Sequence, residues 1–265
     1  MNLRANRSPV ALWDVVVPTT GRPSLFTLLE ALLDGSRRPP GRILVVDDRR
    51  RAGAPLTVPV PVEVLTTGGR GPAAARNAGW RAATAEWVAF LDDDVVPAPD
   101  WADRLAADLD GLPVDVAGSQ AAVRVPLPAG RRPTDWERRV AGLETSRWIT
   151  ADMAYRRSVL AEVGGFDERF PRAYREDSDL GLRAADAGYR IVTGSRVTTH
   201  PVGPPRPWAS VRDQAGNRDD VLMYGLHGRG WREACGAPAG RWRRHAATTA
   251  AGLAGLAGVA ARRPD

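Results

Sequence analysis

The chain has 265 residues, of which 43% are hydrophobic and 26% charged, and its net charge is +6. This length suits one large α/β domain with an appendage, and the apolar fraction suffices for a sizeable core. Every basic residue is Arg, as a GC-rich genome would produce, and no basic stretch alternates with aromatic residues as a nucleic-acid groove requires. We therefore expect no nucleic-acid partner.

Few features of the sequence indicate the cellular compartment. The single cysteine, Cys235, forbids an internal disulfide and fits a reducing cytoplasm. Residues 1–9 are polar, no apolar segment of a signal peptide follows them, and no stretch reaches the roughly 18 apolar residues of a membrane span. We expect a cytoplasmic protein.

The first hundred residues alternate between strand and helix patterns. The predicted strands are 14–18, 42–46, 62–65 and 86–91, and helices are predicted over the segment from Leu25 to Leu33 and over 73–85. The first helix carries five leucines on one stripe and has Ser24 or Thr20 as a candidate cap. The stripe is Leu25, Leu28, Leu29, Leu32 and Leu33.

Continuous apolar strands that alternate with helices indicate a mostly parallel sheet covered on both faces. Ligands of such sheets bind beyond the carboxyl ends of the strands. Three of the predicted strands end in polar groups, which we expect to converge. These groups are Thr19/Thr20, Asp47/Asp48 and Asp92 to Asp94.

The second half is less regular. It contains predicted helices at 99–112, 134–147, 157–163 and 176–187, and predicted strands at 114–125, 150–155, 189–192 and 197–199. We expect an N-terminal tail over 1–12, one domain over 13–205 with halves 13–97 and 98–205, and a helical C-terminal extension with an Arg/Ala-rich tail over 206–265.

The acidic cluster after the fourth strand has the most specific chemistry. Three adjacent carboxylates repel one another and are tolerated when solvated or when a cation lies among them. In extended backbone Asp92 and Asp94 point the same way, which suits a hard divalent cation with open positions for phosphate oxygens. The alternative is an N-cap and turn, which Asp and Pro both favour.

Six motifs in order resemble family-2 glycosyltransferases of the nucleotide-diphospho-sugar transferase (GT-A) fold. They are VVVPTTGRP at 15–23, VVDD at 45–48, GPAAARNAG at 71–79, FLDDD at 90–94, GGFDE at 164–168 and REDSDLGLR at 175–183. The resemblance covers about residues 12–200. It implies a single GT-A domain, with 13–97 as the nucleotide-binding half and 98–205 as the acceptor half.

The resemblance implies a nucleotide site in the first half. It places Asp47 at the nucleobase, with Asp48 as the alternate, and Thr19 and Arg22 near the nucleotide. Turn solvation is the other interpretation of Asp47.

Arg76 in the second helix would then reach the diphosphate or the base, with Asn77 bracing the loop. An Arg fork suits phosphate. The alternative in this Arg-rich chain is a surface helical Arg.

The resemblance also maps the family's Asp-x-Asp motif onto Asp92, Asp93 and Asp94. Asp92 would approach the ribose, and Asp94 would bind Mg²⁺ or Mn²⁺, which neutralises charge on the leaving diphosphate. His200 would be a further ligand, as in some members of the family, or else a structural residue.

Glu176 and Asp177 match the catalytic acidic pair of the family. Direct displacement needs a carboxylate to take the acceptor hydroxyl proton, and we expect Asp177 to be this base, with Glu176 or Asp179 orienting it. Acidic residues are also favourable at a helix N-terminus, and both interpretations hold together.

Four aromatic or imidazole side chains remain open or unassigned. Trp148 and Trp208 are candidates to stack on sugars, with core packing as the default. His227 and His245 lack such a context and are interpreted as surface residues.

The resemblance therefore implies a metal-dependent, inverting glycosyltransferase. Its donor would be a UDP-, GDP- or dTDP-linked sugar and its acceptor a hydroxyl of unknown identity. The alternatives are an inactive nucleotide-sugar-binding or scaffold protein on the same fold, or a sugar-1-phosphate nucleotidyltransferase, whose signature loop residues 19–23 match poorly.

The tail is basic and partly apolar. From Gly228 onward seven arginines stand against Glu233 and Asp265, which leaves a net charge of +5. As a helix, 246–261 could lie on the inner, anionic face of a membrane. Because glycines weaken a helix, we favour a loosely packed or disordered C-terminus.

Overall fold

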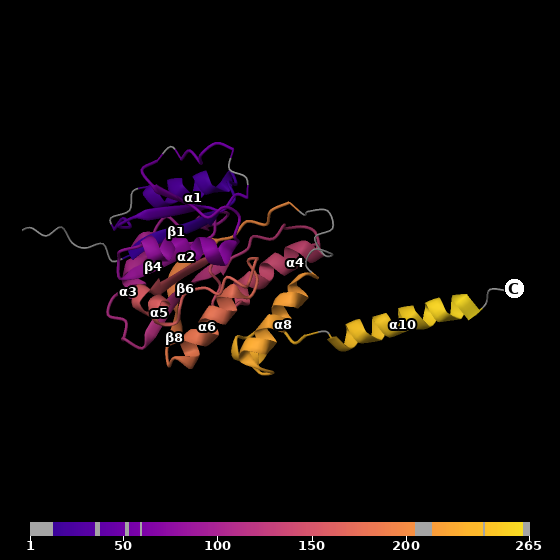
Figure 1. The fold of residues 1–265 in the computed structure, drawn as a ribbon. Coiled ribbons are helices and arrows are strands. Elements are labelled where there is room, and N and C mark those ends of the chain that lie inside the picture. The colour runs from indigo at the N-terminus through magenta and orange to yellow at the C-terminus, as the bar shows by residue number, and fades with distance from the viewer. Residues whose placement is uncertain are drawn as a thin grey trace, which may run out of the picture.

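An eight-stranded mixed sheet forms the centre of the protein (Figure 1), with the strand order β3-β2-β1-β4-β7-β6-β8-β5. The computed structural model describes residues 13–34, 38–50, 53–58, 60–204, 214–240 and 242–261. The strands are β1 (Trp13–Thr19), β2 (Ile43–Asp47), β3 (Glu63–Thr66), β4 (Trp87–Leu91), β5 (Val96–Pro97), β6 (Val116–Arg124), β7 (Asp152–Arg156) and β8 (Arg190–Thr199).

The α/β fold is confirmed, and its central sheet combines parallel with antiparallel pairings. Strands β1 to β4 pair in parallel, as their apolar runs predicted. Strand β7 is antiparallel to both of its neighbours, β4 and β6, and β5 is antiparallel to β8. Strands β6 and β8 pair in parallel, so the second half contains both kinds of pairing, whereas the first half is parallel.

Strand β8 is continuous where the sequence predicted two short strands. Its middle residues, Gly194 to Arg196, break the apolar pattern, yet they stay in the sheet. The buried Arg196 is tolerated there because it bonds Asp152 (2.8 Å) and the hydroxyl of Ser119 (2.9 Å). Register shifts against β6 absorb the irregularity.

Helices flank the sheet. They are α1 (Ser24–Leu33), α2 (Pro72–Ala82), α3 (Trp101–Leu109), α4 (Asp135–Ala141), α5 (Arg157–Glu162), α6 (Glu176–Asp186), α8 (Gly216–His227), α9 (Trp231–Ala234) and α10 (Trp242–Ala261), with a 3₁₀ turn, η1, at Gly142–Thr145.

Each face of the sheet has its own apolar core. Helices α1 and α3 pack on the side of Val15 and Val17, and α2, α5 and α6 pack on the side of Val16. Alternate side chains of β1 therefore enter opposite cores, which explains its unbroken apolar run.

Helix α1 departs from its prediction in two details. Four of the five predicted leucines are buried, but Leu33 at the helix end is 40% exposed. The residue before the helix is Pro23, and neither Ser24 nor Thr20 caps it through a side-chain bond. Proline fixes φ near the helical value, so this helix can begin without a side-chain acceptor.

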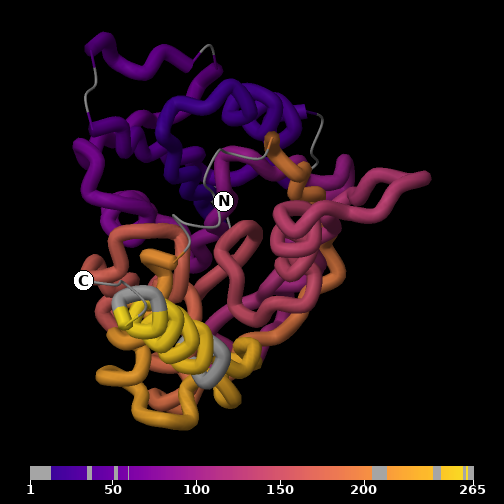
Figure 2. Tube along the Cα trace, turned by 90° about the vertical axis from the view of Figure 1, so that its right-hand side faces the viewer, coloured from indigo at the N-terminus to yellow at the C-terminus, as the bar shows by residue number. Residues whose placement is uncertain are grey.

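Helices α8 and α9 pack against the body through a third, smaller cluster of Phe170, Leu182, Met223, Trp231 and Cys235. Helix α10 projects away from the body (Figure 1) and is seen nearly end-on in Figure 2. Residues 242–261 are helical and their described side chains are exposed, so this part of the tail is a loosely packed helix. Its many alanines have the highest helix propensity and outweigh three glycines.

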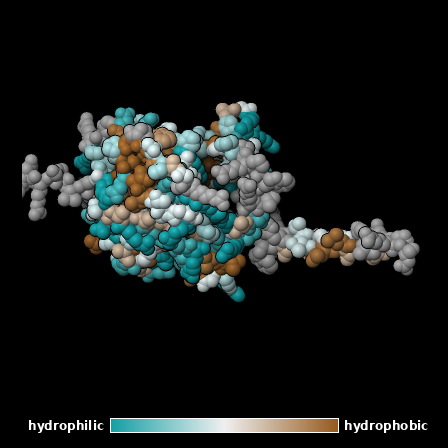
Figure 3. All heavy atoms as spheres, turned by 45° about the horizontal axis from the view of Figure 1, so that its top comes forward, coloured by the Kyte–Doolittle hydropathy of each residue, from teal (hydrophilic) through white to brown (hydrophobic). Residues whose placement is uncertain are grey.

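Apolar atoms gather on α10 (Figure 3), where Leu253 and Leu256 are 63% and 70% exposed. Wherever the structure describes its side chains, this helix is exposed. Among all described helices, none combines the length and hydropathy that crossing a membrane demands.

Candidate functional site

The carboxyl ends of β1, β2 and β4 meet at one edge of the sheet. Thr19 at the end of β1 is in register with Asp47 at the end of β2. The Thr19 hydroxyl donates to Asp93 Oδ2 at 2.6 Å, just beyond β4. The three polar strand ends predicted to converge are therefore brought together by the parallel half of the sheet.

The three aspartates after β4 lie in a turn, closed by a bond from Val95 N to Asp92 O (3.4 Å). Arg22, from the loop after β1, donates to Asp93 at 3.1 Å and also to Asp94. Asp92 instead bonds Arg76 on α2. The expectation that Asp92 and Asp94 point the same way is wrong, because the backbone turns where extended geometry was assumed.

Charge in this turn is largely compensated. Burial raises the pKa of Asp93, while the Thr19 hydroxyl and the Arg22 guanidinium oppose that rise. Arg22 thus acts as an internal counter-ion for the acidic turn.

His200 follows β8 and faces Asp94. Its Nε2 lies 3.6 Å from Asp94 Oδ1, and its Nδ1 lies 3.2 Å from the Pro201 carbonyl oxygen. A carbonyl only accepts, so Nδ1 carries a hydrogen, and Nε2 is the ring nitrogen that faces the carboxylate.

One imidazole nitrogen and one carboxylate fit a divalent cation such as Mn²⁺ or Mg²⁺. Within the part of the chain that the structure describes, no group of three or more His, Cys, Asp or Glu side chains is arranged to hold a metal. The remaining ligands would have to be substrate oxygens or water.

Asp47 and Asp48 have different partners. Asp48 accepts bonds from Thr67 Oγ1 (2.7 Å) and from the amides of Gly69 (2.9 Å), Arg70 (2.8 Å) and Gly71 (2.8 Å). The Asp48 carboxylate therefore holds the loop before α2 in its conformation. Asp47 bonds the Arg49 side chain, which lowers the Asp47 pKa, so Asp47 has the more replaceable partner.

Arg76 lies in the interior. It is 1% exposed and donates to Glu176 Oε1 and to Asp92 Oδ1, both at 2.8 Å. Helix α2 comes close to β1 because Gly79 faces Val16, where a Cβ would lie 2.3 Å from a Val16 methyl. The alternative of a surface Arg is wrong, because close packing of α2 on β1 draws this side chain into the site.

Glu176 and Asp177 begin α6 and differ in access. Glu176 is buried, and its Oε2 has no hydrogen-bond partner among the described residues. Burial, and then the charge of Asp177, raise the pKa of Glu176 to about 8, while Arg76 opposes the shift. Burial also raises the pKa of Asp177, but Asp177 is only half-buried and is the carboxylate that a ligand can reach.

Asp179 is engaged elsewhere. Its Oδ2 accepts from Arg183 (2.7 Å) and its Oδ1 lies 2.8 Å from Nε2 of His227. The interpretation of His227 as a surface residue is therefore wrong. That bond joins α8 to α6, which are far apart in the sequence, and no sequence pattern indicated the contact. The side chain of His245 lies outside the described part of the chain.

Asn77 braces the loop at 164–168. Its Oδ1 accepts from the Phe166 amide (2.9 Å) and Trp80 Nε1 (2.8 Å), and its Nδ2 donates to the Phe166 carbonyl (2.8 Å). Gly165 has φ +70°, and a Cβ there would lie 2.6 Å from Asn77 Oδ1. The paired glycines of this motif allow that close approach.

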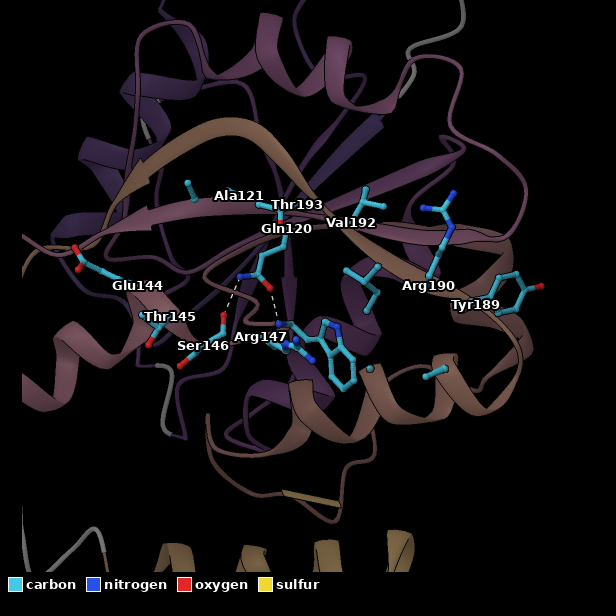
Figure 4. Close-up of a pocket in the computed structure, with 15 residues that line it drawn as sticks. Gln120, Ala121, Glu144, Thr145, Ser146, Arg147, Tyr189, Arg190, Val192 and Thr193 are labelled. Carbon is cyan, nitrogen blue, oxygen red and sulfur yellow. Dashed lines mark hydrogen bonds between the residues drawn. The ribbon is translucent and has the colours of Figure 1, made fainter. Parts of the chain in front are cut away.

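A cavity of about 600 Å³ lies between β6, β8 and α6 (Figure 4). Trp148 lines it and has a left-handed backbone, with φ 63°. Its amide donates to Gln120 Oε1, and Gln120 Nε2 donates to the Ser146 carbonyl at 3.0 Å. The indole packs on Gly181, where a Cβ would lie 2.3 Å from the ring. Trp148 therefore combines core packing with a place in the cavity wall, while Trp208 lies outside the described residues.

Sequence reasoning missed the counter-ion role of Arg49 and the left-handed Arg175, which directly precedes α6 with φ 79°. Arg49 could have been noticed, because it follows Asp47-Asp48 in the chain. The conformation of Arg175 has no signal in the sequence, since an Arg seldom adopts it.

Comparison with protein families gives a match between residues 14–175 and the model described as Glycosyl transferase family 2. A pre-mycofactocin glycosyltransferase of Mycobacterium tuberculosis is 31% identical over 196 residues, which cover 67% of this chain and 40% of the relative. The O-antigen biosynthesis protein RfbC of Myxococcus xanthus is 28% identical over 216 residues, covering 68% of this chain and 16% of that protein. The chain thus spans less than half the length of these curated relatives.

Two solved structures share the fold. The mannosyltransferase PcManGT of Pyrobaculum calidifontis, in complex with GDP-Man and Mn²⁺, superposes with a TM-score of 0.53 and 22% identity, covering 80% of this chain and 64% of that one. Glucosyl-3-phosphoglycerate synthase of Mycobacterium tuberculosis, in complex with phosphoglyceric acid, superposes with a TM-score of 0.55 and 16% identity, covering 86% and 81%.

Proposed function

Because residues 14–175 match its model, the chain belongs to glycosyltransferase family 2, and we propose that it is a metal-dependent, inverting enzyme. It would move a sugar from a nucleoside-diphosphate sugar to an acceptor hydroxyl. The structural relatives support the donor class, since PcManGT is in complex with GDP-Man and Mn²⁺ and S. aureus TarS is in complex with UDP-GlcNAc.

The observation that carries this proposal is the pair of hydrogen bonds that Arg76 donates to two different carboxylates. One buried guanidinium donates to Asp92 of the acidic turn and to Glu176 of the acidic pair, each at 2.8 Å. The proposed donor side and the proposed base are therefore neighbours, as a single displacement requires.

On the donor side, Asp47 would take the nucleobase once Arg49 releases it, and Thr19 holds Asp93 in place. Arg22 lies at the surface beside Asp93 and Asp94, where it would exchange a carboxylate for a donor phosphate. Arg76 would act near the donor by fixing the direction of Asp92.

Asp94 and His200 would hold the divalent cation, which when bound neutralises charge on the departing diphosphate. The arrangement of His200 supports this role, because its Nδ1 bonds a carbonyl and its Nε2 is left to face Asp94.

On the acceptor side, Asp177 would accept the hydroxyl proton as the acceptor oxygen bonds to C1 of the sugar. The bond from C1 to the diphosphate oxygen breaks with its electron pair on the diphosphate, so the configuration at C1 inverts. Burial raises the Asp177 pKa, which makes it a stronger base than an ordinary carboxylate. Glu176, bonded to Arg76, would orient the start of α6.

The test is a screen of UDP-, GDP- and dTDP-sugars with and without Mn²⁺, measured as thermal shift and as release of nucleoside diphosphate. Ligand binding to the folded state raises the melting temperature. Binding without turnover would indicate an inactive sugar-nucleotide-binding protein, and pyrophosphate released from a nucleoside triphosphate and a sugar 1-phosphate in a parallel assay would indicate a nucleotidyltransferase. Retained anomeric configuration in the product would exclude direct displacement.

A first substitution addresses the cation. Asp94→Ala should abolish the part of nucleoside-diphosphate binding that Mn²⁺ adds, because it removes the carboxylate that faces His200. Calorimetric titration with UDP or GDP, with and without Mn²⁺, measures this. Asp115→Asn, on the surface and bonded to Arg190, is the matched control. Full Mn²⁺ enhancement in Asp94→Ala would place the metal elsewhere.

A further inference from the structure

We propose that helices α8 and α9, which lie outside the residues matched by the family model, position the base Asp177 by holding Arg175. This inference rests on the proposed function of Asp177. The match ends at residue 175, and α8 begins at Gly216.

Arg175 occupies the residue directly before α6 and has a left-handed backbone, with φ 79°. A bulky L-residue adopts this conformation rarely and keeps it only when its surroundings hold it there. The next residues are Glu176 and Asp177, so the turn at Arg175 sets the direction in which α6 and its two carboxylates begin.

The side chain of Arg175 is held by the C-terminal helices. Its Nε donates to Asp220 Oδ1 of α8 at 2.8 Å, and its guanidinium carbon lies 4.8 Å from the ring centre of Trp231 in α9. Tyr174 stacks beside it, at 4.3 Å from the guanidinium carbon, and accepts a bond from its Nη2. Asp220 is itself fixed by Arg232, at 2.6 Å.

Two further links enclose the same segment. Arg172 bonds Asp219 of α8, whose side chain is 1% exposed, and Asp179 lies 2.8 Å from Nε2 of His227 at the end of α8. Residues 172–179 are therefore linked to α8 at three points, which lie before Arg175, at Arg175 and after it. Asp177 lies inside this clasp, which we define as the links of Arg172, Arg175 and Asp179 to α8.

The clasp makes Asp220 a positioning residue. Among the described residues it accepts bonds from Arg175, Arg232 and, at 3.4 Å, the Tyr174 hydroxyl, so it acts on the acceptor side through the backbone at 175–177. A general base that is displaced by about 1 Å loses on the order of 10²-fold in rate. Donor binding depends on the opposite half of the site and should not change.

Three variants test this: Asp220→Ala, Asp220→Asn and Asp220→Glu, with Asp115→Asn as the control for loss of one ion-paired aspartate. The assay is hydrolysis of the donor sugar with Mn²⁺, which needs no acceptor. We expect Asp220→Ala to lower kcat by about 10²-fold while the KM for donor stays within about twofold, Asp220→Glu to recover most of kcat, and the control to match the wild type.

Wild-type kcat in Asp220→Ala would overturn the inference, as would parallel losses in kcat and donor affinity that Asp220→Glu does not recover. If Asp220→Ala does not fold, Asp220→Asn serves in its place. It has the same shape and lacks the charge that holds Arg175.

Failure of the inference can be told from failure of the proposed function. A wild-type protein that neither binds nor hydrolyses any of the donors would refute the function alone. The clasp is then read by amide hydrogen exchange at 175–179, which should be faster in Asp220→Asn than in Asp115→Asn. Equal exchange in the two variants would refute the clasp whatever the activity.

Discussion

Asp177 and Glu176 are adjacent in the chain but differ in what surrounds them. Glu176 is enclosed and accepts a bond from Arg76 at 2.8 Å. Asp177 is half-buried and, among the described residues, accepts bonds only from the backbone amide (2.7 Å) and, weakly, the hydroxyl (3.4 Å) of Ser178. Because of this contrast, we propose that Asp177 receives the proton and that Glu176 holds the start of the helix.

Asp177→Asn should fold and bind donor but lose transfer by roughly 10²–10⁴-fold, the usual contribution of a general base. The amide keeps the shape of the side chain and cannot take a proton. Steady-state turnover with donor and Mn²⁺ measures this, and Glu176→Gln is the matched comparison. An active Asp177→Asn beside an inactive Glu176→Gln would move the base by one residue.

The raised pKa of Glu176 also predicts how stability changes with pH. The ordinary value is 4.5 and the folded value is about 8, so between these values the native state binds more protons than the unfolded chain. The free energy of unfolding should therefore fall as pH rises through this window.

Urea unfolding at pH 5 and pH 8 measures that change in the wild type and in Glu176→Gln, which cannot titrate at this position. The decrease should be smaller in the variant. A decrease of the same size in both proteins would show that other groups cause it.

At the scale of elements, strand β8 is joined to β7 and α3 by a buried ionic network. Asp152 accepts bonds from Arg196 Nε (2.8 Å), Trp101 Nε1 (2.6 Å) and the Thr198 hydroxyl. Arg196 and Asp152 have no exposed surface. Such a network is satisfied only while every member is present.

Asp152→Ala should lower the free energy of unfolding by about 3–5 kcal/mol, because it leaves the Arg196 charge buried beside fewer partners. Chemical denaturation measures the loss. Asp115→Ala removes one partner of a solvent-exposed ion pair with Arg190 and should unfold as the wild type does. A small effect of Asp152→Ala would mean that water reaches Arg196.

Helix α10 is a candidate membrane-binding segment, because its apolar residues face solvent and arginines flank it in the sequence. The full chain should bind anionic vesicles in low salt, and a chain that ends at Gly240 should not. Co-sedimentation with phosphatidylserine-containing liposomes, repeated in high salt, decides this. Equal sedimentation of the two proteins would remove any membrane role from the tail.

The elements of the first half could be predicted because each pattern is local. An apolar run such as Val15 to Val17 must be buried on both faces, and the polar residue after each strand must lie at the ligand-binding edge. The order of strands in the second half could not be predicted in this way. It depends on pairings between distant segments, such as Leu91 with Asp152.

In the candidate site, too, local features could be predicted from the sequence and contacts between distant segments could not. Sequence motifs identified the acidic turn, the acidic pair and Arg76, but not their contacts. The direction of Asp92 depends on a turn, the burial of Arg76 depends on how closely α2 approaches β1, and the contact of His227 depends on where α8 docks. These are properties of packing between elements, and no local pattern records them.

At the scale of the whole molecule, both halves of the domain contribute residues to the proposed site. The parallel half, through β4, brings the Thr19, Asp47 and Asp92 ends together. The second half contributes His200 and α6, and the C-terminal helices secure the segment before α6. The proposed site therefore draws on residues from nearly the full described length of the chain, although the family match ends at residue 175.

The bridge of Arg76 between Asp92 and Glu176 has a thermodynamic consequence. A guanidinium shared by two carboxylates cannot strengthen one bond without changing the other, so an event that alters the charge at Asp92 is felt by the proton affinity at Glu176 and Asp177. Occupancy of the nucleotide side and the strength of the base would then be linked functions. Such linkage is reciprocal, so whatever the nucleotide does to the base, protonation of the base must do to nucleotide affinity.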